Sequence, residues 1–452
     1  MKINPHRIKG SLLLGALLIF NFSQAQTDTL RVMAYNVLYY GDTPPCQGSH
    51  SAAHGYLSTI VSYSNPDIIG LDKMAAIPMF TGDHSGSAPA GFADSILQFS
   101  LNIAYPGRYA YCTYSNDAGA DNIGILFYDQ QKLGFINIIS SYSNITDFNT
   151  YKLFYKSADL ESTHDTIFLY ITLNHTNSGS SSSDQSIRAD QINGEMAGIQ
   201  SLFTHLPNAI NMGDFNTHKS SEVCYQTLVA PANPAFRYYD PPFSPDGDIS
   251  YPADWDSNPS AFATYLTTST RLSGMPNSCG SSGGGKSWYD HIFLSDAIAH
   301  NLNAISYIPH SYRTIGNDGN RVGKSINATP INTSAPGLVI DALYRMSNKY
   351  PVMVDLAVNP HTSDVKALAI EKVEVRIVNP VKDLLVLNFD NELIGKNISL
   401  QCINMLGQIM MSSTFSATNE AMRIPCTLRP GIYNLRISAG DKVVSNKVIT
   451  KE

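Results

Sequence analysis

The sequence predicts an α+β protein: two β-sheets flanked by helices, followed by a small C-terminal all-β sandwich. Over residues 28–358, apolar strand-like segments outnumber helix-like segments and alternate with them. After residue 371, short apolar strands are separated by turn residues. The 452 residues suffice for one large core and a smaller module. We expect a signal peptide (1–25), a main domain (28–358), a linker (359–371) and a C-terminal β-sandwich (372–452).

The main domain begins with a strand, because Leu30, Val32 and Ala34 alternate with other side chains at the two-residue period of β-structure. Helical spacing of apolar residues predicts helices over residues 54–65 and 184–203. Further strands are expected at residues 66–71, 122–129, 166–175, 208–216, 287–295 and 349–358. In the C-terminal module, strands are expected at residues 383–389, 397–406, 431–438 and 441–450.

The first 25 residues have the features of an export signal. A basic start is followed by the apolar run SLLLGALLIF and by small residues suited to cleavage. This apolar run is too short to span a bilayer comfortably, and no other long run follows. We therefore expect an exported mature chain without a transmembrane segment.

The charge of the mature chain argues against a typical nucleic-acid binder. Loss of three basic residues with the signal changes the net charge from −7 to −10, and residues 361–452 carry 11 basic and 9 acidic groups. Residues 361–452 therefore carry a net charge of +2, which leaves a net charge of about −12 (−10 − 2) on residues 26–360. Such acidity opposes phosphate binding unless divalent cations offset it.

The chain contains six cysteines, and none forms a CxxC pair, which disfavours a zinc knuckle. Export permits disulfides. Cys402 and Cys426 lie in the same small module and are candidates for a bridge. The sequence leaves any pairing among the other four open.

Residues 280–287, GSSGGGKS, match the phosphate-loop pattern GxxxxGK[ST]. That loop works only between a strand and a helix, where backbone N–H groups and a helix N-terminus meet the phosphates. Here a loop precedes the motif and a strand follows it. We therefore interpret the segment as a flexible Gly/Ser loop.

Polar residues follow several of the predicted strands, and these are the candidate site residues. Asp214 and Asn216, in MGDFN, share one face of an extended chain directly after a buried run. Such a pair can hold a hydrated divalent cation and orient a phosphate-bound nucleophile. Asn36, His175 and Asp290 end three other predicted strands.

In this order, the residues resemble the endonuclease/exonuclease/phosphatase superfamily, the deoxyribonuclease-I-like fold, over residues 28–358. The resemblance implies a four-layered sandwich that hydrolyses phosphoesters with Mg²⁺ or Mn²⁺. It assigns Asn36 to metal and phosphate placement and His175 to the scissile phosphate. It assigns Asp214 and Asn216 to the metal and attacking water, and Asp290 to holding the last catalytic histidine.

The sequence departs from the family pattern at three positions. Lys73 stands where the family has its metal-binding glutamate, and strand alternation argues that Asp72 does not replace it. Near the end of the domain, Asn348 and Lys349 stand where the family has aspartate and histidine. A lysine repels a divalent cation, and one beside Asp290 is a poor general base.

These replacements leave three interpretations open. In the first, the site is catalytically inactive, with Lys73 paired to Asp214 and Lys349 paired to Asp290, and it needs no cofactor. Alternatively, it binds a phosphate-bearing or other anionic ligand through Lys73, Lys349 and His175 without cleaving it. In the third, it is a working hydrolase whose Mg²⁺ or Mn²⁺ is held by Asn36, Asp214 and Asn216 or by other residues.

The C-terminal residues resemble the type A sorting domain of the type IX secretion route. The matching segments are VRIVNPVKDLLVLNF (375–389), INMLGQ (403–408), LRPGIYNLRI (428–437) and NKVIT (446–450). An adhesive or carbohydrate-binding sandwich is the alternative. The resemblance implies contact with an outer-membrane secretion machinery and a secreted or cell-surface location in a Gram-negative bacterium.

Overall fold

The computed structural model describes residues 28–76, 92–158, 160–163, 166–359, 375–390, 393–404, 409–439 and 442–452. The expected signal peptide lies outside these residues, as does all of the expected linker except residue 359. The chain divides into two units, residues 1–361 and 362–452, and each is described by itself.

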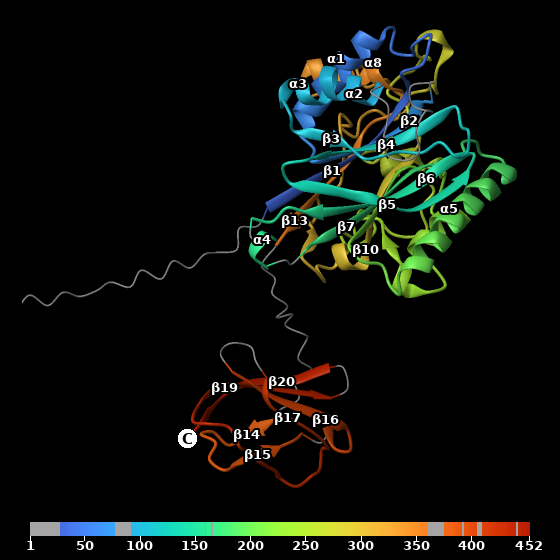
Figure 1. Cartoon of the computed structure of the whole chain (residues 1–452). Helices are drawn as coiled ribbons and strands as arrows, with labels where there is room; N and C mark the ends of the chain where they lie inside the picture. The colour runs from blue at the N-terminus through green and yellow to red at the C-terminus, as the bar shows by residue number, and fades with distance from the viewer. Residues whose placement is uncertain are drawn as a thin grey trace, which may run out of the picture. The chain divides into compact units, whose positions relative to one another are not determined.

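The first unit is built on two β-sheets (Figure 1). In the described residues, the first sheet has the strand order β11-β13-β1-β2-β4-β3, with β12 beside β13. The second has the order β5-β6-β7-β8-β10-β9. The strands of the first sheet are β1 (Asp28–Tyr40), β2 (Ile68–Ala75), β3 (Tyr109–Tyr111), β4 (Asn122–Asp129), β11 (Ile305–Tyr307), β12 (Arg313–Thr314) and β13 (Val352–Val358). Those of the second are β5 (Leu133–Asn144), β6 (Thr146–Tyr155), β7 (Phe168–His175), β8 (Ala209–Asp214), β9 (Tyr238–Tyr239) and β10 (Asp290–Ser295).

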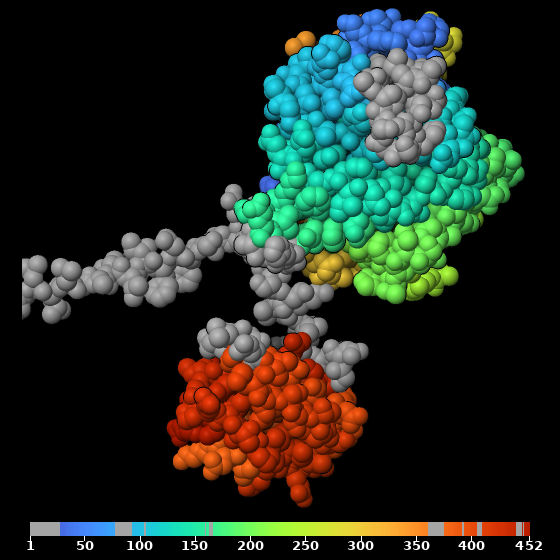
Figure 2. All heavy atoms as spheres, viewed as in Figure 1, coloured from blue at the N-terminus to red at the C-terminus, as the bar shows by residue number. Residues whose placement is uncertain are grey.

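Helices pack on the outer faces of both sheets, which gives the predicted four layers. Helices α1 (His50–Ser64) and α8 (Gly337–Met346) share a core with the outer face of the first sheet. Helices α5 (Ser182–Leu202) and α6 (Val223–Val229) contribute to the core of the second sheet, and α5 contacts β5 (Figure 1). In Figure 2 the green atoms of the α5 region border the teal atoms of the strand region. The shorter helices are α2 (Phe92–Ile96), α3 (Asn102–Ala104), α4 (Leu160–Thr163) and α7 (Asp296–Ala299).

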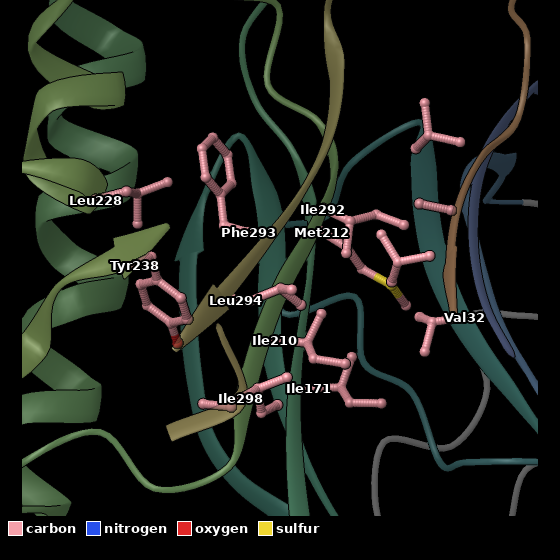
Figure 3. Close-up of a cluster of buried hydrophobic side chains, with 14 of the residues drawn as sticks. Val32, Ile171, Ile210, Met212, Leu228, Tyr238, Ile292, Phe293, Leu294 and Ile298 are labelled. Atoms are coloured by element: carbon pink, nitrogen blue, oxygen red, sulfur yellow. The ribbon is translucent and has the colours of Figure 1, made fainter. Parts of the chain in front are cut away.

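Strand alternation explains why β1 is apolar on both sides. Val32 and Ala34 point into the core between the sheets, while Met33 and Tyr35 point into the helix-facing core. Between the sheets, Val32 lies near Ile210 and Met212 of the second sheet (Figure 3).

Gly70 in β2 packs closely against side chains of the second sheet. A Cβ atom at Gly70 would lie 2.7 Å from side-chain atoms of both Leu173 and Met212. A larger residue would therefore require these two side chains to shift.

The second unit is a β-sandwich, as predicted. One sheet has the order β14-β15-β18 and the other β17-β16-β19-β20, and their inner faces share one apolar core. The strands are β14 (Arg376–Ile377), β15 (Leu384–Asn388), β16 (Asn397–Ile403), β17 (Ile409–Ser416), β18 (Met422–Pro425), β19 (Gly431–Ala439) and β20 (Lys442–Lys451). None of the described helices is long and apolar enough to cross a membrane.

The candidate bridge in the C-terminal module is not formed. Cys402 and Cys426 are buried free thiols in its core. The disulfide instead joins Cys46 to Cys279 across 233 residues of the first unit. The GSSGGGKS segment is an irregular loop followed by β10, so it lacks the helix that phosphate binding requires.

Candidate functional site

Strand register brings the acidic site residues of the second sheet together. Strand β8 lies between β7 and β10, and Asp214 at its end pairs in register with both His175 and Asp290. Asn36 and Asp72 pair in the same way on β1 and β2 of the first sheet. The Asn36 Nδ2 donates to Asp214 Oδ2 at 2.8 Å, which connects the two sheets at the site.

Asp214 is the centre of the site. Its Oδ2 also lies 2.8 Å from the Lys349 ammonium, and its Oδ1 accepts the backbone N–H of Asn216 at 3.1 Å. Burial would raise the pKa of Asp214, but the charges of Lys349 and its other neighbours outweigh burial and lower this pKa to about 2. Asp214 is therefore a carboxylate at all ordinary pH values.

Lys349 is a buried structural cation. Its ammonium lies 3.6 Å from Asp290 Oδ2 as well as beside Asp214, and 4.6 Å from the centre of the Tyr289 ring. Burial lowers the pKa of Lys349, but Asp214 and Asp290 reverse that effect and raise it above its ordinary value. The expected pairing with Asp290 is confirmed, and Lys349 cannot act as a general base near neutral pH.

Asn348 and Asn216 hold loops rather than face an open cavity. Asn348 Nδ2 donates to Ser281 Oγ at 2.6 Å, and Asn216 Nδ2 donates to the Thr176 backbone carbonyl at 2.9 Å. Asn348 therefore anchors the loop that begins at Gly280, and Asn216 anchors the segment that follows β7.

The expected pairing of Lys73 with Asp214 was wrong. Within the described part of the chain, the Lys73 ammonium forms no ion pair or hydrogen bond, and it lies 5.1 Å from the centre of the Tyr39 ring. Its backbone φ is +53°, and the strand register shifts between Leu71 and Met74. This bulge sets Lys73 apart from the regular strand, so Lys349 takes the place beside Asp214.

The argument that Asp72 points away from the site was also wrong. Gly70 faces the second sheet, and Asp72, two residues further along, lies on that same inner face. Asp72 is completely buried, and neither carboxylate oxygen has a hydrogen-bond partner. Burial raises the pKa of Asp72 well above its ordinary value, and the charges of Asp214 and Asp290 add to this effect.

His175 is held in one tautomer by Asn122. The Asn122 amide donates to Asp121 Oδ1, so its oxygen faces His175 Nδ1 at 2.7 Å. Nδ1 must therefore carry the proton, and Nε2 carries a lone pair. Burial and the charge of Lys73 lower the pKa of His175 to about 3, so the ring is neutral.

The metal that the family resemblance implies was tested against these donors. An asparagine binds a cation through its Oδ1 atom, and the Oδ1 of Asn36 already accepts the Leu38 backbone N–H at 3.0 Å. By contrast, Asp72, His175 and Asp214 each offer one ligand atom, and these atoms lie within 4.8 Å of one another. A cation fits the second set better, because the acceptors of Asp72 and His175 Nε2 have no other partner.

Comparison with known proteins gives a result for each unit. Residues 379–451 match the model of the secretion system C-terminal sorting domain, so the chain carries this domain. Among curated proteins, none matches the chain.

Similar solved structures include an endonuclease/exonuclease/phosphatase from Beutenbergia cavernae DSM 12333, TDP2 from Caenorhabditis elegans, and ANGEL2, a 2',3'-cyclic phosphatase. The Beutenbergia protein is 12% identical with a TM-score of 0.38, covering 93% of this chain and 99% of its own. The TDP2 structure is 14% identical with a TM-score of 0.41, covering 73% of this chain and 75% of its own. ANGEL2 is 10% identical, with a TM-score of 0.38, and the match covers 74% of this chain and 96% of the ANGEL2 chain.

Proposed function

We propose that the first unit is an exported phosphoester-hydrolase-like domain that is catalytically impaired and binds a phosphate-bearing or other anionic ligand. The observation that carries this proposal is the position of Lys349. Its buried ammonium lies 2.8 Å from Asp214 and 3.6 Å from Asp290, where family chemistry would require a metal ligand and a histidine–aspartate pair. A fixed positive charge there neutralises the carboxylates without supplying a base or a Lewis acid.

Lys73 is the residue we assign to ligand binding. It is partly exposed and forms no ion pair with a described residue, so its three N–H donors remain available. Tyr39 lies under the ammonium, and the charge of Lys73 lowers the pKa of His175. A phosphate group that reaches this position would accept charge-assisted hydrogen bonds from Lys73.

A second candidate function is a working phosphodiesterase with a modified metal site. The orphaned carboxylate of Asp72 favours it, because a cation bound there would satisfy both oxygens. In that case Mg²⁺ or Mn²⁺ would supply a Lewis acid, and Asp72 would serve where the family glutamate is missing.

One enzymatic comparison separates the two functions. The full chain and the triple variant Lys73→Glu, Asn348→Asp, Lys349→His are assayed for hydrolysis of bis(4-nitrophenyl) phosphate and DNA with Mg²⁺ or Mn²⁺. We expect little turnover by the native chain, because loss of one positioned acid–base group costs on the order of 10²–10⁴ in rate. Strong metal-dependent turnover by the native chain would refute the impaired-site proposal.

Anion binding is tested separately by calorimetry with inorganic phosphate. We expect heat from the native chain and its loss in Lys73→Met. Equal binding by native protein and variant, or no heat at all, would contradict the role assigned to Lys73.

The sorting domain supports the location of the protein. A chain with this module is directed to secretion or to the cell surface, with the outer-membrane machinery as its partner. We propose that residues 1–25 are a signal peptide and that the protein is exported by a Gram-negative bacterium. Extracellular fractionation of the full chain and of a variant that lacks residues 1–25 tests this proposal.

A further inference from the structure

Several buried acceptor atoms of the site lack a hydrogen-bond partner, among them both carboxylate oxygens of Asp72 and the Nε2 atom of His175. Both oxygens of Asp290 and the Oδ1 atom of Asn348 also lack one, but Asp290 forms an ion pair with Lys349, whereas Asp72 forms none with a described residue. A buried acceptor without a partner lowers stability, and does so more strongly when it is charged. Such a cluster therefore needs a ligand that supplies positive charge or a donated proton.

The backbone places these acceptors on converging strands. Asp72 lies on the inner face of β2, and His175 ends β7, in register with Asp214 of β8. The Asn122 hydrogen bond fixes the His175 ring so that its lone pair is on Nε2, the nitrogen state required for metal binding. The imidazole and its outer hydrogen-bond partner thus have the arrangement of a metal-binding histidine.

We propose that Asp72, His175 and Asp214 bind a divalent transition-metal cation, such as Zn²⁺ or Mn²⁺. This ligand set differs from Asn36, Asp214 and Asn216, which the family resemblance predicts. It does not rest on anion binding at Lys73, since different side chains carry the two proposals.

The dimensions of the cluster suit such an ion. The three ligand atoms lie within 4.8 Å of one another. Two ligands of a tetrahedral Zn²⁺, each bonded at about 2.1 Å, lie about 3.4 Å apart. Any pair of these atoms that lies further apart must therefore move closer, by about 1.4 Å at most, when the ion binds.

The chemistry of the ligands selects the class of metal. An imidazole nitrogen with two carboxylates suits Zn²⁺ or Mn²⁺, whereas Mg²⁺ prefers oxygen ligands and retains its waters. Three protein ligands leave a fourth position for water or a ligand atom.

The local charge balance also favours a cation. Three carboxyl groups, those of Asp72, Asp214 and Asp290, lie near the ammonium groups of two lysines, Lys73 and Lys349. Lys349 competes with the cation at Asp214 Oδ2, but Asp214 Oδ1 carries a further lone pair beside the Asn216 N–H group.

A second acidic cluster supplies a matched control. Asp246, Asp248 and His310 also offer three ligand atoms within 4.8 Å. However, Asp246 already accepts hydrogen bonds from Tyr307 and from the His310 backbone. Its acceptors are satisfied, and we assign no site to this exposed cluster.

The test is calorimetry of the full chain with ZnCl₂, MnCl₂ and MgCl₂, without an affinity tag. We expect one Zn²⁺ or Mn²⁺ site, weakened at least about 100-fold in Asp72→Asn, since even outer-shell partners contribute about 10–100-fold. His175→Gln should show the same loss, whereas Asp248→Asn should bind like the native chain. Co²⁺ in the native site should give visible absorption bands that both site variants lack.

Three outcomes would overturn the proposal: no saturable Zn²⁺ or Mn²⁺ binding, native affinity in Asp72→Asn, or loss of binding in Asp248→Asn. Asp72→Asn is isosteric, and far-ultraviolet circular dichroism verifies that each variant is folded. If His175→Gln does not fold, the Asp72→Asn result decides alone. Because phosphate binding and hydrolysis are measured separately, a metal site without turnover supports this inference and leaves the impaired-site proposal standing.

Discussion

Replacing Lys349 by methionine should destabilise the first unit strongly. The side chain of Lys349 is 7% exposed, and those of Asp214 and Asp290 are 1% and 0% exposed. The substitution keeps an apolar stem of similar length but leaves both carboxylates without their shared cation. Removing one partner of a buried ion pair costs about 3–5 kcal/mol, whereas a surface pair is worth about 0–1 kcal/mol.

The assay is equilibrium unfolding in guanidinium chloride, followed by tryptophan fluorescence. Both tryptophans of the chain, Trp255 and Trp288, are buried in the first unit, so the signal reports on this unit alone. We expect the free energy of unfolding to fall by about 3–5 kcal/mol in Lys349→Met. Adding Asp290→Asn should recover part of this loss, because it removes one of the uncompensated charges.

Lys73→Met is the matched control, since it removes the other lysine of the site. Lys73 has no ion pair with a described residue, and burial lowers its pKa. Its replacement should therefore change the free energy of unfolding by less than about 1 kcal/mol. A loss below 1 kcal/mol in Lys349→Met, or equal losses in both variants, would refute the assignment of Lys349 as the structural cation.

Three further predictions concern other parts of the first unit. The Cys46–Cys279 disulfide closes a loop of 233 residues, and changing both cysteines to alanine should cost about 5 kcal/mol in the loop-closure model, measured by guanidinium unfolding. Burial raises the pKa of Glu195 to about 8. Because the unfolded chain loses this proton near pH 4.5, the stability of the fold should decline as the pH rises from about 4.5 to about 8. Melting curves of Glu195→Gln should lack that decline. Burial lowers the pKa of His218, but hydrogen bonding to Asp256 outweighs burial and raises this pKa above 6.5. The stability that protonated His218 contributes should be complete below pH 6.5 and should be lost as the pH rises through the raised pKa. The same dependence of melting temperature on pH in His218→Gln would contradict this.

The regular elements of the fold could be predicted because their patterns are local. Leu30, Val32 and Ala34 show the period of β1, and residues 122–129 form β4 with the predicted bounds. The β5–β6 hairpin was not predicted, because the partly exposed β5 has no continuous apolar run. Its packing depends instead on Gly194 of α5, where a Cβ atom would lie 2.1 Å from the Tyr142 ring.

The site could be predicted only as a set of residues, without its partners. Asn36, Asp214 and Asp290 do converge, because strand ends at one edge of a sandwich meet regardless of sequence separation. Which lysine reaches Asp214 depends on the bulge at Lys73, and a positive φ at a lysine leaves no recognisable signature in the sequence.

The two lysines therefore have separate roles that the substitution pattern alone does not distinguish. Lys349 forms ion pairs with the carboxylates at the ends of β8 and β10, Asp214 and Asp290, and so stabilises the fold. Lys73 and Asp72 are neighbours in sequence, yet one presents unused donors and the other unused acceptors. A site retired completely would be expected to satisfy both, because each unmet buried group lowers stability without a return in function. The unmet groups at Asp72 and His175, rather than the lost family residues, are thus the observations on which the proposed cation site rests.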